Sequence, residues 1–105
     1  MTRWTPGNLV DGRKVIAVAG TPERLAGTTT VADRTETTSI IIQAESDNTG
    51  TVTVGTSTVI DATATRRGTY LAAGDSVTLS ITNLFKVWLD VSASGDGVTY
   101  LAESP

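Results

Sequence analysis

Strict alternation of apolar and polar residues in the last third of the chain is the feature that most limits the fold. Two short runs place apolar side chains at every second position: Val77, Leu79 and Ile81 in the first, and Val87, Leu89 and Val91 in the second. A period of two is typical of a β-strand with one buried face. No stretch shows a sustained helical period, and a composition led by Thr, Val and Ala suits strands. We therefore expect an all-β protein.

The turn at residues 94–97, Ser-Gly-Asp-Gly, predicts a hairpin, because its residues tolerate the positive φ angles that hairpin turns need. The predicted core face of this hairpin holds Leu89, Val91, Ala93, Val98, Tyr100 and Ala102. The opposite face carries Trp88 and Leu101 near one another. These two side chains are either ordinary surface residues, or covered by a neighbouring loop, or part of a protein interface, since exposed Trp beside aliphatic surface is typical of protein contacts.

Shorter strand candidates occupy the rest of the chain. Residues 13–19 have apolar side chains on both faces, which predicts an interior or subunit-covered strand. Three consecutive Ile residues within 38–44 predict a central strand. Further short strands are expected at residues 51–55, 58–60 and 68–72. About seven or eight strands with short connections predict a small antiparallel β-sandwich of jelly-roll or immunoglobulin-like type, with a barrel as the alternative.

The first twelve residues lack any sustained period and contain Pro6, Gly7 and Gly12. We expect an extended N-terminal arm at residues 1–12, ahead of a single β-sandwich domain at residues 13–105. Trp4 and Leu9 are costly to leave in water, each representing roughly 1.5–3 kcal/mol of burial when fully covered. They either dock back onto the domain or contact a partner, and we expect partner contact.

The composition argues against several classes of protein. The 105 residues include no Cys and no His, which excludes disulfides and thiolate metal sites and removes the usual base of a Ser or Cys nucleophile. The net charge of −3 disfavours nucleic-acid binding, and no apolar run approaches the ~20 residues of a membrane helix. The sequence therefore predicts a protein that is not an enzyme, holds no cofactor or metal, and contacts neither nucleic acid nor membrane.

Two turns and one basic pair admit a second interpretation. The turns at residues 47–50 (Asp-Asn-Thr-Gly) and 96–97 (Asp-Gly) resemble fragments of calcium loops, but neither has the full ligand spacing and turn chemistry accounts for both. Arg66 and Arg67 either lie solvated in a polar loop or bind an acidic partner surface through bidentate pairing. We take them as candidate partner contacts.

Six segments spread between residues 20 and 101 carry a resemblance: GTPERL (20–25), SIIIQA (39–44), NTGTVTVG (48–55), RGTYLAAGDSVTL (67–79), NLFKVWLDV (83–91) and GDGVTYL (95–101). In their order and spacing they resemble small virion proteins of tailed bacteriophages, of the head decoration or cement type. The residues before 20 match no pattern in that group.

The resemblance implies a non-enzymatic capsid decoration protein on the outer surface of the virion head. Its partner would be the major capsid protein, whose neighbouring subunits it would bridge. It also implies a homotrimer, and the outward hairpin face that carries Trp88 and Leu101 is where we expect the subunit interface. The alternative is a tail or fibre domain that binds a host-surface glycan or another virion protein. No catalytic residues follow from the resemblance.

Overall fold

The described residues form eight strands and one short 3₁₀ helix. The computed structural model describes residues 8–26, 37, 39–81 and 83–104. The strands are β1 (Asn8–Val15), β2 (Glu23–Arg24), β3 (Ser39–Ala44), β4 (Val52–Gly55), β5 (Thr69–Leu71), β6 (Ser76–Leu79), β7 (Trp88–Val91) and β8 (Gly97–Ser104). The helix η2 (Leu84–Lys86) lies between β6 and β7, where the Asn83 side chain accepts a hydrogen bond from the Phe85 N–H.

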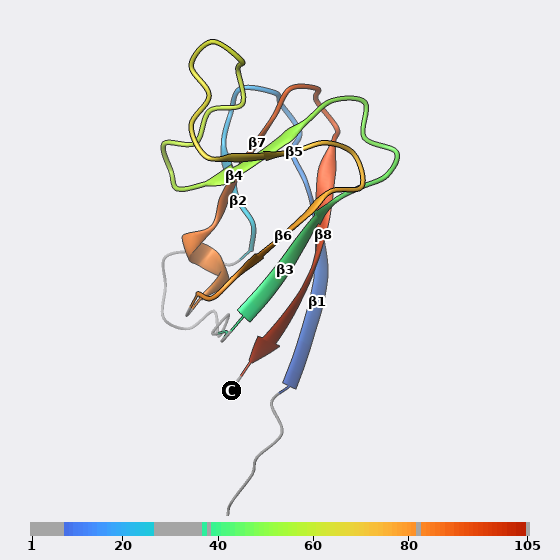
Figure 1. Cartoon of the computed structure of the whole chain (residues 1–105), viewed down its shortest axis with the longest axis vertical. Helices are drawn as coiled ribbons and strands as arrows, with labels where there is room; N and C mark the ends of the chain where they lie inside the picture. The colour runs from blue at the N-terminus through green and yellow to red at the C-terminus, as the bar shows by residue number, and fades with distance from the viewer. Residues whose placement is uncertain (1–7, 27–36, 38, 82, 105) are drawn as a thin grey trace, which may run out of the picture.

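Two antiparallel four-stranded sheets make up the fold, sheet A in the order β1-β8-β3-β6 and sheet B in the order β2-β7-β4-β5. The first strand pairs with the last, the second with the seventh, the third with the sixth and the fourth with the fifth. The chain is thus a set of nested antiparallel pairs wound into two layers (Figure 1). This strand order is that of a jelly roll. The predicted all-β sandwich is confirmed, and the topology selects the jelly roll over the immunoglobulin-like sandwich and the barrel.

Apolar side chains from both sheets fill the space between the layers. In β3, Ile40, Ile42 and Ala44 are fully buried whereas Ile41 and Gln43 face outward, as the period of two requires. Sheet B contributes a matching buried set: Val52, Val54, Leu71, Leu89 and Val91. Of the core residues predicted around the turn at 94–97, four are buried (Leu89, Val91, Val98 and Ala102) and two are half-buried (Ala93 and Tyr100).

The predicted arm is wrong over its second half. Residues 8–12 belong to β1, which pairs along its whole length with β8, from Asn8 opposite Ser104 to Val15 opposite Gly97. The sequence pattern hides this strand, because an edge strand places charged residues among its apolar ones. Gly12 also interrupts the pattern, and it leaves room for the Tyr100 ring that lies across it, which a β-carbon would overlap. Residues 1–7, including Trp4, lie outside the described residues.

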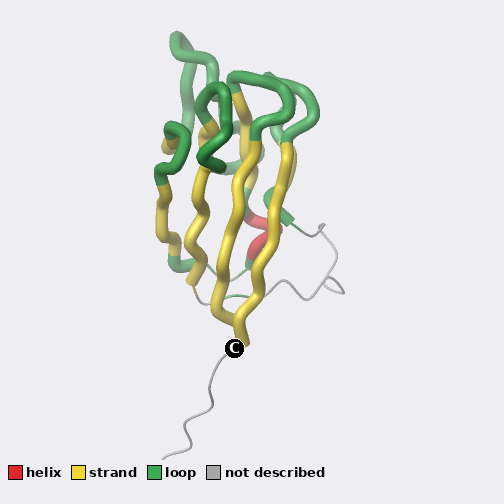
Figure 2. Tube along the Cα trace, turned by 90° about the vertical axis from the view of Figure 1, so that its right-hand side faces the viewer, coloured by secondary structure: helices red, strands yellow, loops and turns green. Residues whose placement is uncertain are grey.

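Strands β7 and β8 do not form the predicted hairpin. β7 lies in sheet B between β2 and β4, whereas β8 lies in sheet A between β1 and β3. The turn between them therefore carries the chain from one sheet to the other, at the end of the domain where most described loops gather (Figure 2). A glycine-containing turn suits either connection. Alternation decides which side chains face inward, but it does not decide which strand lies alongside.

Two further strand predictions fail in their bounds. The strand expected at residues 13–19 ends at Val15, and Val18 is 56% exposed, so its second face is not covered. The chain leaves the sheet there because Ile16 exchanges hydrogen bonds with the turn at Gly95 and Asp96 and then crosses toward β2. No strand forms at residues 58–60, where Ile60 pairs with Arg67 in an isolated bridge.

The phenol of Tyr100 is expected to titrate above pH 10 in the folded protein. Burial raises the pKa of Tyr100 above its ordinary value of 10.0, and the nearby charge of Asp11 adds to the effect. Because the folded pKa lies above the unfolded one, the unfolded state loses its proton first as the pH rises. The associated stability is therefore fully present below pH 10 and is lost as the pH rises through the folded pKa.

Absorbance titration of Tyr70→Phe measures this directly, since the chain has 2 Tyr residues and Tyr100 is then the remaining phenol. The same titration in urea supplies the unfolded reference. Equal midpoints in the folded and unfolded variant would contradict the prediction.

Candidate functional site

The outer face of sheet A carries three exposed apolar side chains that adjoin one another. Ile41 on β3 pairs with Leu101 on β8, and the two residues are 46% and 44% exposed. Leu9 on β1 pairs with Glu103, diagonal to Leu101, and is 70% exposed. Opposite and diagonal neighbours on one face of a sheet lie within reach of each other. We call this set, Leu9, Leu101 and Ile41, the apolar stripe, a surface suited to burial by a partner.

Charged and polar groups border the apolar stripe. Arg13 of β1 reaches across β8 to Glu45, with Nε 2.5 Å from Oε2 and Nη2 3.0 Å from Oε1. This hydrogen-bonded pair raises the pKa of Arg13. At the other end of the stripe, Ser39 Oγ donates to Glu103 Oε1 at 2.9 Å. An apolar centre with a polar border is the usual composition of a protein interface.

Trp88 does not join this surface. It lies in β7 of sheet B, half-buried, and the Arg24 guanidinium stacks over its ring at 4.6 Å from the centroid. Arg24 also donates to the Phe85 carbonyl at 2.6 Å. The predicted proximity of Trp88 to Leu101 is therefore wrong, because it depended on the hairpin and the two residues belong to different sheets. The structure instead agrees with the interpretation that a neighbouring segment covers Trp88, since Arg24 of β2 stacks on its ring.

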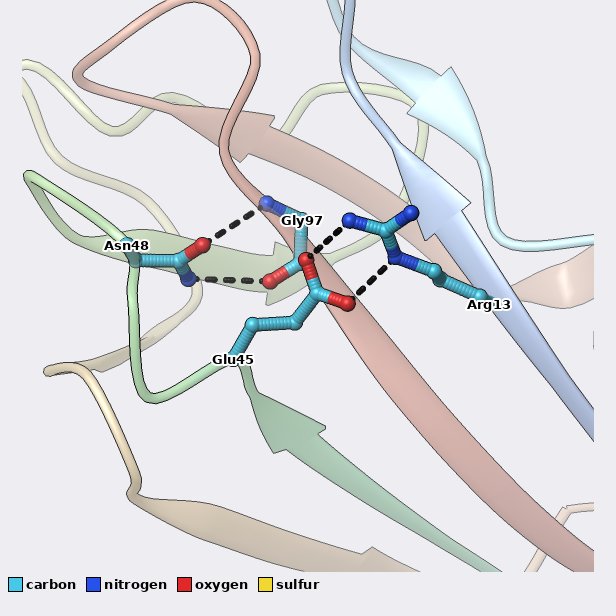
Figure 3. Close-up of polar contacts among 4 residues, drawn as sticks. All are labelled: Arg13, Glu45, Asn48 and Gly97. Atoms are coloured by element: carbon cyan, nitrogen blue, oxygen red, sulfur yellow. Dashed lines mark hydrogen bonds and ion pairs between the residues drawn. The ribbon is translucent and has the colours of Figure 1, made fainter.

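The turns at residues 47–50 and 96–97 bind one another at the loop end of the domain. Asn48 Nδ2 donates to the Gly97 carbonyl at 2.9 Å, and Asn48 Oδ1 accepts from the Gly97 N–H at 3.0 Å (Figure 3). In return, the Asp96 carboxylate accepts from the N–H groups of Thr49 at 3.0 Å and Gly50 at 2.7 Å. Each turn satisfies the backbone of the other, which is the turn chemistry favoured by the sequence.

A cleft of about 960 Å³ opens on the sheet B side of the loop end. The loop at residues 57–67 forms one wall and Ala19, Gly20 and Pro22 another, while Thr51 and residues 90–92 contribute strand ends. Asp61 and Asp90 line the cleft and are 2% and 3% exposed.

Both carboxylates are occupied in holding the surrounding loops. Asp90 Oδ1 accepts from the N–H groups of Gly20 at 3.0 Å and Val91 at 2.9 Å, and its Oδ2 accepts from the Asp61 N–H at 2.9 Å. Asp61 Oδ2 accepts from Thr53 Oγ1 at 2.7 Å. Buried carboxylates with satisfied oxygens stabilise a fold, so these two fix the loop and the turn against sheet B. Sequence reasoning missed them because no local pattern brings residues 61 and 90 together.

Arg66 and Arg67 lie at the cleft, as a pair in sequence but with different surroundings. Arg66 Nε donates to the Asp61 carbonyl at 3.1 Å, and its guanidinium stacks on the Tyr70 ring at 4.3 Å. Arg67 is exposed, while its backbone pairs with Ile60. The Arg66 side chain therefore already makes contacts within the fold. Both arginines lie on the sheet B side of the domain, away from the apolar stripe on the outer face of sheet A. Tyr70, 54% exposed, was not singled out by the sequence.

Within the described ranges, no three carboxylates gather as a metal site. The same ranges contain no helix of the length and apolar character needed to span a membrane. Comparison of the chain with protein-family models, with curated proteins and with solved structures found no match.

Proposed function

We propose that this protein is a non-enzymatic decoration protein that binds the outer surface of a bacteriophage head and stabilises contacts between major capsid subunits. The apolar stripe on the outer face of sheet A is the observation that carries the proposal. Its three side chains lie on β1, β8 and β3, which are neighbouring strands of one sheet, so they can be buried together against a flat partner surface. Phage virion proteins are also what the order of sequence motifs resembles.

The mechanism follows from linkage and repetition. A protein that binds assembled capsid better than free subunits stabilises the assembly by mass action. Weak contacts repeated over a symmetric lattice then add up without any one of them being tight. Jelly rolls occur in viral capsid domains, which is support by analogy, because a fold hosts many functions.

Ile41→Glu is expected to weaken binding to capsids that lack the protein by at least about tenfold, since a buried charge without a partner is costly in an interface. Because Ile41 faces outward, the free energy of unfolding should change by less than about 1 kcal/mol. Co-sedimentation with capsids measures the first quantity and urea denaturation the second.

Thr63→Glu is the matched control, because it introduces the same charge at an exposed position of the loop on the sheet B side. Trp4→Ala tests separately whether the N-terminal residues contribute. Capsid binding by Ile41→Glu equal to that of Thr63→Glu would contradict the proposed face. Cryo-electron microscopy that places the protein on the tail would contradict the proposed function.

A second candidate, a tail or fibre domain that binds a host glycan, is favoured by the cleft beside Arg66. A cleft lined by both apolar and hydroxyl side chains, next to a stacked arginine and an exposed tyrosine, offers hydrogen-bond donors and an aromatic face to a sugar. Chemical-shift changes confined to the cleft on addition of host polysaccharide would favour this function over capsid decoration.

A further inference from the structure

The outer edge of β1 presents, at every second residue, backbone groups that no described strand pairs with. Gly97 faces Val15 in the ladder, yet its N–H and C=O are directed to Asn48 and Glu45 on the other side of β8. The Val15–Gly97 pair is therefore a non-hydrogen-bonded pair, and such pairs alternate along an antiparallel ladder. It follows that the N–H and C=O groups of Leu9, Asp11, Arg13 and Val15 point away from β8.

No described strand lies beyond this edge. β1 is the terminal strand of sheet A, and it stands at the right-hand side of the sheet with β8 as its neighbour (Figure 1). Exposure agrees: Leu9, Val10, Asp11, Arg13 and Val15 are all exposed. An eight-residue edge of this kind is a ready template for pairing with another strand.

The side chains of this edge are complementary to themselves. If two copies of β1 pair antiparallel with Gly12 opposite Gly12, then Asp11 of each copy faces Arg13 of the other. The same register sets Leu9 opposite Val15, which are 70% and 37% exposed. All these side chains are on the outer face, because they alternate with Val10, Gly12 and Lys14. Opposite charges and apolar pairs directly across a ladder stabilise pairing.

We propose that two copies of this protein associate through β1 about a two-fold axis at Gly12, joining their A sheets into one continuous sheet. In this register the central Gly12 pair is non-hydrogen-bonded, so the outward N–H and C=O groups of the four odd-numbered residues of each β1 strand all find partners. Arg13 donates from Nε and Nη2 to the Glu45 carboxylate. Its Nη1 does not donate to Glu45, so a second carboxylate can accept a hydrogen bond from it.

Neighbouring registers are disfavoured by charge. A two-fold axis at Asp11 sets two aspartates opposite one another, and an axis at Arg13 does the same with two arginines. Like charges directly opposite destabilise a ladder. Charged edges usually prevent association. In β1, however, Asp11 and Arg13 are placed so that opposite charges meet when Gly12 of one copy faces Gly12 of the other. The contact is isologous and closes on itself, so it produces a dimer instead of the trimer that the phage resemblance implies.

Sedimentation equilibrium and hydrogen exchange of the full chain test this pairing. The wild type is expected to dimerise in the micromolar to sub-millimolar range, roughly that of weak specific assemblies. Amide protection at residues 9, 11, 13 and 15 should fall on dilution, while the amides of residues 10, 12 and 14, bonded to β8, stay protected. Asp11→Lys and Arg13→Asp should each raise the dimer dissociation constant by at least about tenfold, because symmetry makes each substitution count twice.

Mixing these two variants should restore association as a heterodimer, because the introduced lysine then faces the introduced aspartate and the wild-type pair remains intact. Asp11→Pro should abolish dimerisation with the fold retained, since it removes an outward N–H and leaves the ladder with β8 complete. Asp75→Lys, an equal charge change in an exposed turn beside β6 at the opposite edge of sheet A, should leave the dissociation constant within about twofold of wild type. A wild type that stays monomeric or forms trimers, or a mixture that does not associate more tightly than the single variants, would overturn the proposal.

Discussion

Asp90→Ala is expected to lower the free energy of unfolding by about 3–5 kcal/mol. The Asp90 carboxylate is 3% exposed and accepts hydrogen bonds from three backbone N–H groups, those of Gly20, Asp61 and Val91. Alanine would leave the N–H groups of Asp61 and Val91 buried without a partner. The effect should be large because one side chain ties together β7, the turn before β2 and the loop at residues 57–67.

Urea denaturation followed by circular dichroism measures the loss. The free energy of unfolding of Asp90→Asn should lie between those of the wild type and Asp90→Ala. The amide keeps the shape of the carboxylate, but its NH₂ group faces at least one backbone N–H that needs an acceptor. Asp75→Ala is the matched control: its exposed carboxylate accepts from one N–H, that of Ala72 at 3.1 Å, and its loss should cost at most about 1 kcal/mol. An Asp90→Ala variant within that same range would show that the loop and turn are held in place by other contacts.

Gly97→Ala should also be strongly destabilising, by about 2–3 kcal/mol. A β-carbon at Gly97 would lie 2.9 Å from Val15 Cα and closer still to the Lys14 carbonyl oxygen. Both atoms belong to the backbone of β1, so they cannot rotate out of the way as a side chain could. The strand would have to move off β8, and the two Asn48 hydrogen bonds to Gly97 would be disturbed with it.

Gly95→Ala separates this steric cause from backbone strain. Gly95 has a φ of +92°, but a β-carbon there would meet no atom within 4 Å. Its substitution should therefore cost roughly the 1–2 kcal/mol of a left-handed residue and less than Gly97→Ala. The reverse order in urea denaturation would mean that β1 shifts freely against β8.

The sequence predicted the inward faces of the strands better than their neighbours. In β7 the alternation of Leu89 and Val91 with Trp88 is a local property, and it correctly predicted that Leu89 and Val91 are buried. The partner of β7 is not local: the turn at residues 94–97 has the same chemistry whether it joins two paired strands or crosses between sheets. This is why the core was predicted correctly around that turn while the contact of Trp88 with Leu101 was not.

The candidate site could be predicted only in part from the sequence, for the same reason. Leu9 and Leu101 were each singled out as exposed apolar residues, but their proximity depends on the pairing of β1 with β8, which the charges and Gly12 in β1 conceal. Ile41 was assigned to a central strand without a face. Asp61 and Asp90 are polar residues in unremarkable surroundings, and only the closing of the loop over sheet B buries them.

Nested pairing makes the order of synthesis matter for this protein. A ribosome adds roughly 5–20 residues per second, so β1 leaves the exit tunnel seconds before β8, its partner in sheet A. Until then Leu9 and Val10 have no ladder to join, and the sheet lacks the strand that separates β1 from β3. Long-range pairing of this kind folds slowly and leaves strands open to wrong partners. A chain that ends before β8 would therefore be unable to complete sheet A. We expect such a chain to be degraded as an unfolded protein instead of folding as a smaller domain.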